Sequence, residues 1–541
     1  MAGIFPGAPS LSDYWRLICK GVCEIGPVPK SRWITETFTS HDGKNVDGRS
    51  HSLSDRGAFL PPIEFDPIQF GIPPNSLAAI DPTQILALKV ASDALEDWGY
   101  FEHEDGNRVS VIFGVESGGD LASSVGLRTL IPHYMGRLPR EFDEVLPAVT
   151  TDSFPGMLAN VCAGRIANRL DLRGLNCTVD AACGSSIAAL NLAADELILG
   201  RCDVALAGAV DLHNAASDYV MFSSLGALSP TGEARVFDRS ADGIVLGEGA
   251  GCLVLKRLAD AERDGDPIHA VLRGIGTSSD GRALGLTAPR VDGQVLAFER
   301  AYKVGNIDRN LVGLIEAHGT GTAVGDSAEV TTIERIFEGD TRSKIRLGSV
   351  KAQIGHTKCA AGMAGVIKAA LCVEMGVFPV QPALSTPLPE WNPGGRILFQ
   401  DRTVPWTTQA RSRVAGISAF GFGGTNYHAV ITGYEGSEPE LNDGLWSAEL
   451  VIGWGSGLED AITRTKTIMS SQHPADSIRY IAQQCWNSRR VDSDKVQFAI
   501  VTESKDRLRE QIDAIEKRGR LEQGVFLRQR KENRDGHIVG L

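Results

Sequence analysis

The chain has 541 residues, of which 43% are hydrophobic and 22% are charged, and its formal net charge is −13. This length and composition are typical of a globular protein with more than one domain and an ample core. The acidic balance argues against nucleic acid or an anionic membrane as a general partner, because like charges repel. It does not exclude a local basic patch that binds an acidic protein.

The pattern of cysteines and the N-terminal sequence both favour a cytoplasmic protein. The ten cysteines form no C-x-x-C pair and no cluster with zinc-like spacing. We therefore expect thiols in a reducing cytoplasm and no metal site. The first residues lack the basic and apolar regions of a signal peptide, and no apolar run is long enough to span a membrane.

Predicted helices and strands alternate along the first 434 residues. The start, M-A-G-I-F-P-G-A, enters a loop, and no strand is expected before the first helix at 10–19. Asp81 is expected to cap a helix at 83–98, with Pro82 in its first turn. Apolar runs predict strands at 109–115, 204–210, 248–257, 268–275, 313–317, 347–350, 414–418 and 428–432. Further helices are predicted within 153–170 and at 184–200, 293–302, 328–337 and 360–375. This alternation is typical of an α/β fold whose sheets are covered on both faces.

The sequence changes character past Tyr434. The polar stretch 435–443 predicts a domain boundary. A small α/β unit is predicted to follow, with strands at 450–454 and 498–501 and helices at 461–469 and 505–517. The charged tail from Arg518 is expected to fray.

The stretch V-D-A-A-C-G-S-S-I-A-A-L predicts a strand end, a sharp turn of small residues and a helix start, with Cys183 at the join. Apolar residues then recur at the helix period. A helix N-terminus lowers the pKa of a thiol, and the thiolate is the nucleophile. Cysteine is also a common buried hydrophobic residue, which is the interpretation for most of the other nine. Taken alone, the motif leaves both roles open.

Three further stretches carry groups suited to chemistry. E-A-H-G-T-G-T-A-V-G-D places His318 just past a strand, and V-K-A-Q-I-G-H-T-K contains Lys351 and His356. The third, S-A-F-G-F-G-G-T-N-Y-H, is a glycine-rich turn between two strands. Each alone is compatible with a structural role, and His428 is interpreted as structural. Together, Cys183 and the first two histidines would face one side of a parallel sheet, where sites form in such folds.

These four motifs, in this order, resemble the β-ketoacyl synthase (ketosynthase) family. D-P-T-Q, A-G-R-I-A-N-R-L-D-L-R-G, L-S-P-T-G and D-G-I-V-L-G-E-G-A-G also resemble that family, and the similarity covers residues 2–434. T-D-S-F-P-G-M-L-A-N and V-D-A-A-C resemble ketosynthases of large type I polyketide synthases of the polyunsaturated-fatty-acid and glycolipid-lipid kind. The tail from 435 resembles the start of the linker that joins such a ketosynthase to an acyltransferase.

The resemblance implies the thiolase fold, an α/β architecture of two similar halves in a five-layered αβαβα arrangement, usually as a homodimer. The halves would span 1–255 and 256–434, and 435–541 would be a partial, linker-like α/β region. No repeat between the halves is visible in the sequence.

The resemblance also implies decarboxylative Claisen condensation. Cys183 would take an acyl group from the phosphopantetheine arm of an acyl carrier protein. A malonyl-type extender on a carrier would then lose CO₂ and attack the thioester. The chain would bind no cofactor of its own, and an acyltransferase domain or subunit is a further implied partner.

Roles for the site residues follow from the same resemblance. His318 and His356 would donate through Nε2 to the oxyanion of the extender. The backbone N–H groups of Cys183 and Phe422 would hold the oxyanion of the acyl thioester. The remaining implied residues are Lys351 paired with Glu329, Asp326 in support, Thr320 and Thr322 on the pantetheine arm, Phe420 and Gly421 at the substrate, and Phe422 as a gate.

The sequence departs from the family pattern in three ways. Family members begin with an apolar strand before the G-x-F-P-G region, and Met1 stands where that strand would just have ended. Gly184 follows the nucleophile where alanine or serine is commoner, which loosens the turn. The linker stops partway, as in an excised fragment or a stand-alone enzyme with an unfinished tail.

Two other functions stay open on the sequence. A non-elongating acyltransferase of this fold tends to lose the histidine of H-G-T-G-T, and a non-catalytic docking or chain-length partner lacks the cysteine; both residues are present here. Met221 and Phe222 are candidates for lining the acyl pocket. The acyl chain length, the extender unit and the product are not predicted.

Overall fold

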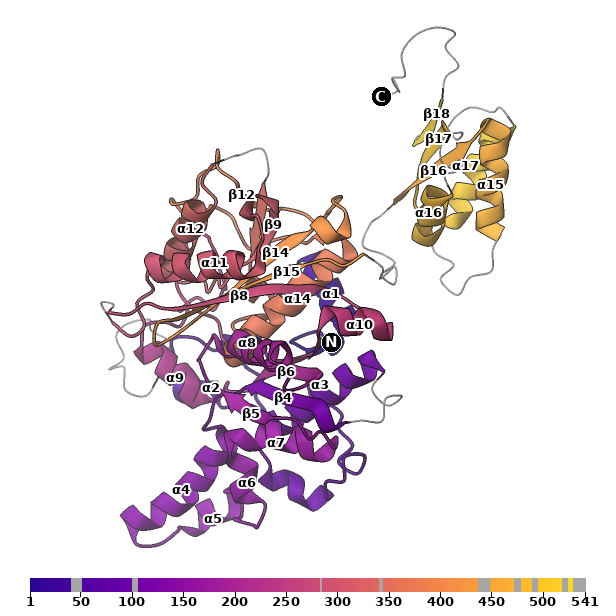
Figure 1. Cartoon of the computed structure of the whole chain (residues 1–541). Helices are drawn as coiled ribbons and strands as arrows, with labels where there is room; N and C mark the ends of the chain where they lie inside the picture. The colour runs from indigo at the N-terminus through magenta and orange to yellow at the C-terminus, as the bar shows by residue number, and fades with distance from the viewer. Residues whose placement is uncertain are drawn as a thin grey trace. The chain divides into compact units, whose positions relative to one another are not determined.

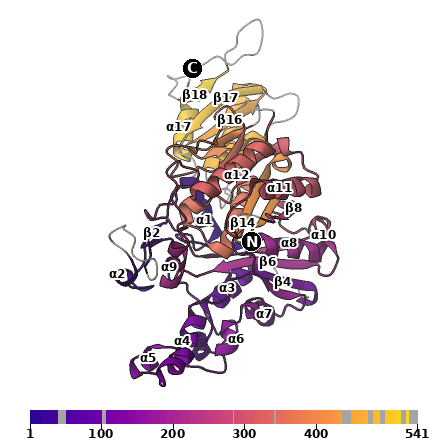
Figure 2. The same ribbon diagram turned by 90° about the vertical axis from the view of Figure 1, so that its left-hand side faces the viewer.

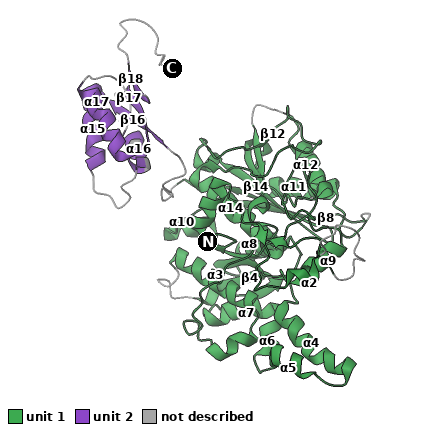
Figure 3. Ribbon diagram, turned by 180° about the vertical axis from the view of Figure 1, so that it is seen from behind, with its two compact units in different colours: residues 1–437 green, residues 438–541 purple. Residues whose placement is uncertain are grey.

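The computed structural model describes residues 1–39, 51–99, 106–282, 285–339, 344–435, 448–470, 478–488, 495–517 and 524–528. The chain divides into two compact units, Met1–Ser437 and Glu438–Leu541 (Figure 3). None of the described helices is long and apolar enough to cross a membrane.

The first unit is built on two mixed sheets. The first sheet has the order β1-β7-β6-β4-β5, with β1 at Ala2–Ile4, β4 at Val109–Gly114, β5 at Asn176–Val179, β6 at Val204–Asp211 and β7 at Gly249–Lys256. The second has the order β12-β10-β9-β14-β15-β8, with β8 at Val271–Ser279, β9 at Val312–Glu316, β10 at Ile345–Gly348, β12 at Ile397–Phe399, β14 at Val414–Gly421 and β15 at Thr425–Thr432.

The two sheets repeat one topology. β1-β7-β6-β4-β5 in the first sheet matches β8-β15-β14-β9-β10 in the second. The strand directions match as well: β4 is parallel to β5 and β6 as β9 is to β10 and β14, and the other pairs are antiparallel in both. The two similar halves implied by the resemblance are therefore confirmed, although the sequence shows no repeat.

Helices complete a five-layered stack (Figure 1). The two central helices, α8 (Ser185–Ile198) and α14 (Ala361–Met375), contact strands of both sheets. The outer layers are α3 (Pro82–Trp98) with α7 (Ala159–Arg169), and α11 (Val291–Gly305) with α12 (Ala323–Ile336). Because α14 is covered on every side, all of its residues but the last two are buried. The αβαβα arrangement is confirmed.

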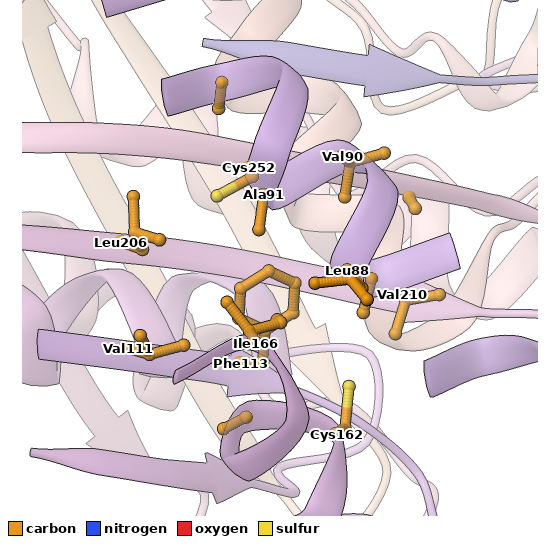
Figure 4. Close-up of a cluster of buried hydrophobic side chains, with 14 of the residues drawn as sticks. Leu88, Val90, Ala91, Val111, Phe113, Cys162, Ile166, Leu206, Val210 and Cys252 are labelled. Atoms are coloured by element: carbon orange, nitrogen blue, oxygen red, sulfur yellow. The ribbon is translucent and has the colours of Figure 1, made fainter. Parts of the chain in front are cut away.

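Apolar side chains of α3 pack on the outer face of the first sheet (Figure 4). Leu88 and Ala91 of α3 share this cluster with Phe113 of β4 and Leu206 of β6. The helix begins where the sequence predicts, because Asp81 accepts a hydrogen bond from the N–H of residue 83 at 2.9 Å.

The prediction that no strand precedes the first helix is wrong. Residues 2–4 form β1, which pairs antiparallel with β7 through Ala2–Cys252 and Ile4–Ala250. β1 occupies the place in the first sheet that β8 occupies in the second. Three residues are too few to show a strand period, so only pairing with a distant strand reveals it.

Several helices of the first unit were not predicted. α4 (Asp120–Met135) and α5 (Arg140–Val145) lie together beside α6 (Ser153–Met157) in both views of the unit (Figures 1 and 2). α4 has little amphipathic character and contains Pro132, so it gives no helical pattern in the sequence. The other short helices that were not predicted are α2 (Thr35–Phe38), α9 (Ala216–Ser224), α10 (Leu258–Asp264) and α13 (Lys351–Ile354). The helix predicted at 10–19 is present as α1 (Leu11–Lys20).

The second unit is a small α/β body with its own core. Its antiparallel sheet has the order β16-β17-β18, at Glu449–Gly455, Lys495–Thr502 and Val525–Leu527. Its helices are α15 (Leu458–Ser470), α16 (Ile478–Asn487) and α17 (Lys505–Glu516). The four elements predicted here are present, and α16 and β18 were missed. The polar stretch after residue 435 and most of the charged tail lie outside the described residues.

Candidate active site

Cys183 lies on a sharp turn between β5 and α8. Ala182, just before it, has a left-handed backbone with φ 49°, which is costly for a residue with a side chain. Ser185 holds the turn from inside, because its Oγ accepts from the N–H of Ala181 at 2.9 Å and donates to the carbonyl of Ala182 at 2.6 Å. Cys183 is 8% exposed and lies just before Gly184, the N-cap residue of α8.

The thiol of Cys183 is not acidified in the free site. Burial raises its pKa to about 11, although Lys351 lowers it. The sequence-based prediction of a lowered pKa is therefore wrong, because removing the thiolate from water outweighs the favourable charge nearby. The thiolate has to form as the substrate arrives.

His318 follows β9 and is held as a neutral ring. Its Nδ1 accepts a hydrogen bond from the backbone N–H of Phe420 at 3.3 Å. Burial, together with the charge of Lys351, sets its pKa well below the usual value. A neutral imidazole that accepts at Nδ1 carries its proton on Nε2, so His318 is a hydrogen-bond donor at Nε2.

His356 is held in the same state. Its Nδ1 accepts from the backbone N–H of Lys358 at 3.0 Å. Burial and nearby positive charges set its pKa well below the usual value. Its Nε2 is buried and has no hydrogen-bond partner among the described residues. The rings of His318 and His356 have centroids 5.6 Å apart at an interplanar angle of 84°.

Two buried carboxylates of α12 hold the loop that carries His318. Glu329 accepts from the N–H groups of His318 at 2.8 Å and Gly319 at 2.7 Å. One oxygen of Asp326 accepts from the N–H groups of Thr320 at 2.9 Å and Gly321 at 3.2 Å. Burial raises the pKa of Glu329 to about 7 and that of Asp326 to about 6. The loop is thus fixed through its backbone.

Lys351 completes this support in a way the sequence did not predict. Its Nζ donates to the backbone carbonyl of His318 at 2.5 Å, and the residue is 5% exposed. No ion pair joins Lys351 to Glu329, and both residues are described. The expected pairing is therefore wrong. Lys351 and Glu329 each form a hydrogen bond to the main chain of His318, Lys351 to its carbonyl and Glu329 to its N–H.

The glycine-rich turn after β14 packs against the nucleophile turn. A Cβ on Gly421 would lie 2.3 Å from the carbonyl oxygen of Ala181, so this approach requires glycine. Phe422 is 38% exposed, and its ring lies 6.3 Å from that of Phe222. In the part of the chain the structure describes, the backbone N–H groups of Cys183 and Phe422 have no hydrogen-bond acceptor.

One cavity of about 430 Å³ brings most of the predicted residues together. Its lining includes Cys183, His318, Thr320, Thr322, His356, Phe420, Gly421 and Phe422. The hydroxyls of Thr320 and Thr322 are 3.0 Å apart. The cavity lining does not include Lys351, Asp326 or Glu329, which support the loop of His318 from outside the cavity. Met221 and Phe222 are not among the lining residues of this cavity, and their place in an acyl pocket stays a prediction.

The cavity also has polar residues that the sequence analysis missed. Asp280 and Asn426 line it and are joined by a hydrogen bond of 2.8 Å. Each lies at one end of the paired strands β8 and β15, and only that pairing brings them to the site. His428 is structural, as predicted: it is fully buried and hydrogen-bonded to Tyr302 and Ser418.

Comparison with known proteins agrees with this geometry. Residues 1–261 match the model of the β-ketoacyl synthase N-terminal domain, and residues 269–385 match that of its C-terminal domain. Over 470 residues the chain is 36% identical to a polyunsaturated fatty acid synthase protein of Thraustochytrium sp., covering 81% of this chain and 16% of that protein. Over 438 residues it is 37% identical to a phenolphthiocerol/phthiocerol polyketide synthase protein of Mycobacterium tuberculosis, covering 79% and 23%.

A solved structure is similar over nearly the whole chain. The ketosynthase from module 6 of the bacillaene synthase of Bacillus subtilis 168 aligns with a TM-score of 0.71 and 28% identity, covering 97% of this chain and 85% of that one. The chain spans about a fifth of the length of the curated relatives named above.

The five-layered fold, with a cysteine at a helix N-terminus facing two histidines, defines an acyltransferase of the thiolase class. The chain belongs to the β-ketoacyl synthase family. The resemblance seen in the sequence is confirmed.

Proposed function

We propose that this chain performs decarboxylative Claisen condensation in a polyketide or polyunsaturated-fatty-acid type of synthase. The observation that carries the proposal is the shared state of the two histidines. Each Nδ1 accepts a backbone N–H, so both Nε2–H groups are donors beside one cysteine. Two preorganised donors are what a developing oxyanion requires.

The first step loads Cys183. The thiolate attacks the carbonyl carbon of an acyl thioester on the phosphopantetheine arm of a carrier protein, and the carrier thiol leaves with the proton. The N–H groups of Cys183 and Phe422 stabilise the oxyanion of this step. The hydroxyls of Thr320 and Thr322 bind the pantetheine arm, and Phe422 gates the acyl pocket.

The second step extends the chain. A malonyl thioester loses CO₂, and the electron pair of the broken C–C bond forms an enolate whose oxygen accepts from Nε2 of His318 and His356. The enolate carbon attacks the acyl thioester, and the thiolate of Cys183 leaves. The product is a 3-oxoacyl thioester two carbons longer. The chain binds no cofactor of its own in either step.

The partners follow from this chemistry. An acyl carrier protein delivers both substrates, and an acyltransferase domain or subunit supplies the extender. We also propose a homodimer, supported by β5, an edge strand directly before the nucleophile turn. A cytoplasmic location is supported by the absence of any disulfide among the ten cysteines, all of which are described.

The test is intact-protein mass spectrometry with a panel of acyl-thioester donors. Wild type should gain the mass of one acyl group, and Cys183→Ala should gain none. Adding malonyl carrier protein should then release the 3-oxoacyl product. His356→Ala should still load while extension falls by about 10²–10³-fold, the usual effect of losing one oxyanion donor.

Each other outcome favours a different function. Loading without extension in wild type would favour a non-elongating acyltransferase. No loading by any donor, in folded and dimeric protein, would favour a non-catalytic partner of a synthase.

A further inference from the structure

A second polar cluster lies directly behind His356. Its nearest member is Lys358, whose backbone N–H donates to Nδ1 of His356. The backbone of Lys358 is left-handed, with φ 45°, although the residue is not glycine. Such a conformation persists only where the surroundings impose it.

The side chain of Lys358 is buried, and its ammonium group has three acceptors. Its Nζ lies 3.1 Å from Oδ1 of Asp211, and it donates to Oδ1 of Asn214 at 3.0 Å and to the carbonyl of Gly247 at 3.2 Å. These are three acceptors for the three N–H bonds of an ammonium group. The side chains of Lys358 and Asp211 are 6% and 0% exposed.

Asp211 ties the cluster to the scaffold. It ends β6, and its second oxygen accepts from the backbone N–H of Cys359 at 3.3 Å. The carbonyl of Cys359 accepts from the hydroxyl of Ser186, in the first turn of α8 after the nucleophile. The ion pair therefore joins the last residue of β6 to the segment that carries His356 and to the helix that follows Cys183.

The cluster is not a vacant metal site. Oxygen and sulfur atoms of Glu116, Asp211 and Cys359 lie within 4.8 Å of one another, as ligands of a cation would. The ammonium group of Lys358 already supplies the positive charge, at ion-pair distance from Asp211.

Stability alone does not explain the pair. A buried ion pair is seldom more stabilising than apolar residues of the same size, because both charges are removed from water. Apolar side chains at positions 211 and 358 could fill this space. They could not fix residue 358 by hydrogen bonds to residues 211, 214 and 247 at once.

We propose that the Lys358–Asp211 ion pair is a positioning device for His356. By anchoring the side chain of Lys358, it keeps the backbone at this residue left-handed and aims its N–H at Nδ1 of the histidine. That hydrogen bond keeps the ring proton on Nε2, facing the cavity, because the bond at one ring nitrogen decides where the proton sits.

This inference rests on the proposed function, since it explains how the donor of the extension step is maintained. Cys183 is not held by this hydrogen bond. Loss of the ion pair should therefore slow the loss of CO₂ from the malonyl carrier and leave acyl loading nearly unchanged.

The test uses the double variant Asp211→Asn with Lys358→Met. Removing Lys358 alone would leave the buried carboxylate of Asp211 with His213, whose Nδ1 lies 3.3 Å away, as its remaining cationic partner and would risk unfolding. In the double variant the ring of His213 keeps Glu116 at 4.0 Å. The matched control is the double variant Lys256→Met with Asp266→Asn. Lys256 pairs with Asp264 and Asp266 at the opposite end of the paired strands β6 and β7. Three quantities are measured: the loading rate of Cys183 by intact mass, the rate of CO₂ release, and the crystal structure around residue 358.

In the double variant, CO₂ release should fall by about 10²-fold, as for a lost oxyanion donor, while loading changes by less than about threefold. The crystal structure should show the contact between the backbone at 358 and Nδ1 of His356 broken. The control should match wild type in all three measurements.

Two results would overturn the inference. One is a double variant with wild-type CO₂ release or an intact contact to Nδ1. The other is an equal fall in loading and CO₂ release, which a general loss of structure would produce. If wild type itself neither loads nor releases CO₂, the proposed function fails, and the crystal structure still decides whether the ion pair sets the backbone at 358.

Discussion

Replacing Asp326 by asparagine should change how the stability of the protein depends on pH. The side chain is fully buried, and its two oxygens accept from three backbone N–H groups, two in the His318 loop and one at Phe237. Asparagine keeps the shape but replaces one accepting oxygen by an NH₂ group that faces a donor. The variant therefore leaves at least one buried N–H donor unsatisfied, which costs about 1–3 kcal/mol.

The sign of the pH effect follows from the pKa of Asp326. Burial raises it from 3.8 to about 6 in the folded protein. The folded state thus binds the proton more tightly than the unfolded state, so this stabilising share is present at low pH and is lost as the pH rises through the folded-state pKa. The two pKa values give a fall of about 1.3 kcal/mol in the free energy of unfolding of wild type between about pH 5 and about pH 7.

The measurement is urea unfolding of wild type and Asp326→Asn at several pH values across this range. Groups that titrate in both proteins contribute equally to the two free energies of unfolding, so their effects cancel in the difference between wild type and variant. The variant should be less stable than wild type at the acidic end, and the gap should narrow by about 1.3 kcal/mol towards neutral pH. A constant gap would mean that Asp326 is already ionised at the acidic end. A widening gap would mean that the N–H donors outweigh burial. Either result would refute the reasoning.

Three further changes test other parts of the structure. Alkylation of Cys183 by iodoacetamide, followed by mass spectrometry, should accelerate about tenfold per pH unit from neutral pH towards its pKa of about 11. Lys351→Met should slow this alkylation at a given pH, because Lys351 lowers the pKa of Cys183. An alkylation rate that levels off near neutral pH would contradict the raised pKa. Lys368→Met leaves the carboxylate of Glu316, 2% exposed, without its ion-pair partner. It should cost about 3–5 kcal/mol in urea unfolding, and a wild-type midpoint would contradict this. Gly276→Ala would place a Cβ 1.9 Å from a carbonyl oxygen of α11. It should cost about 1–3 kcal/mol or more in thermal unfolding; an unchanged midpoint would show that the helix can move aside.

The central features of the fold could be predicted because they are local in the sequence. The turn at Cys183 is a run of small residues between an apolar strand and a periodic helix. His318 and His356 stand in glycine-rich motifs, and the resemblance of those motifs to one family linked them before any distance was known. The structure brings all three residues to one cavity.

What the sequence could not predict depends on contacts between distant segments. β1 exists only through its pairing with β7, and the support of Lys351 reaches a carbonyl group, which no side-chain pattern encodes. The raised pKa of Cys183 comes from the depth of its burial. Lys358 offered one usable signal, a lysine in the otherwise small and apolar run T-K-C-A-A-G, which implies a buried acidic partner.

The way α12 holds the His318 loop bears on how this protein can be redesigned. In this loop, Asp326 and Glu329 accept hydrogen bonds only from main-chain N–H groups, at residues 318 to 321. The hydrogen bonds between these carboxylates and the loop therefore do not depend on which side chains occupy positions 318 and 320. Libraries at these two positions should yield folded proteins in high proportion. New reactivity can therefore be sought in the cavity without redesigning the contacts between α12 and this loop.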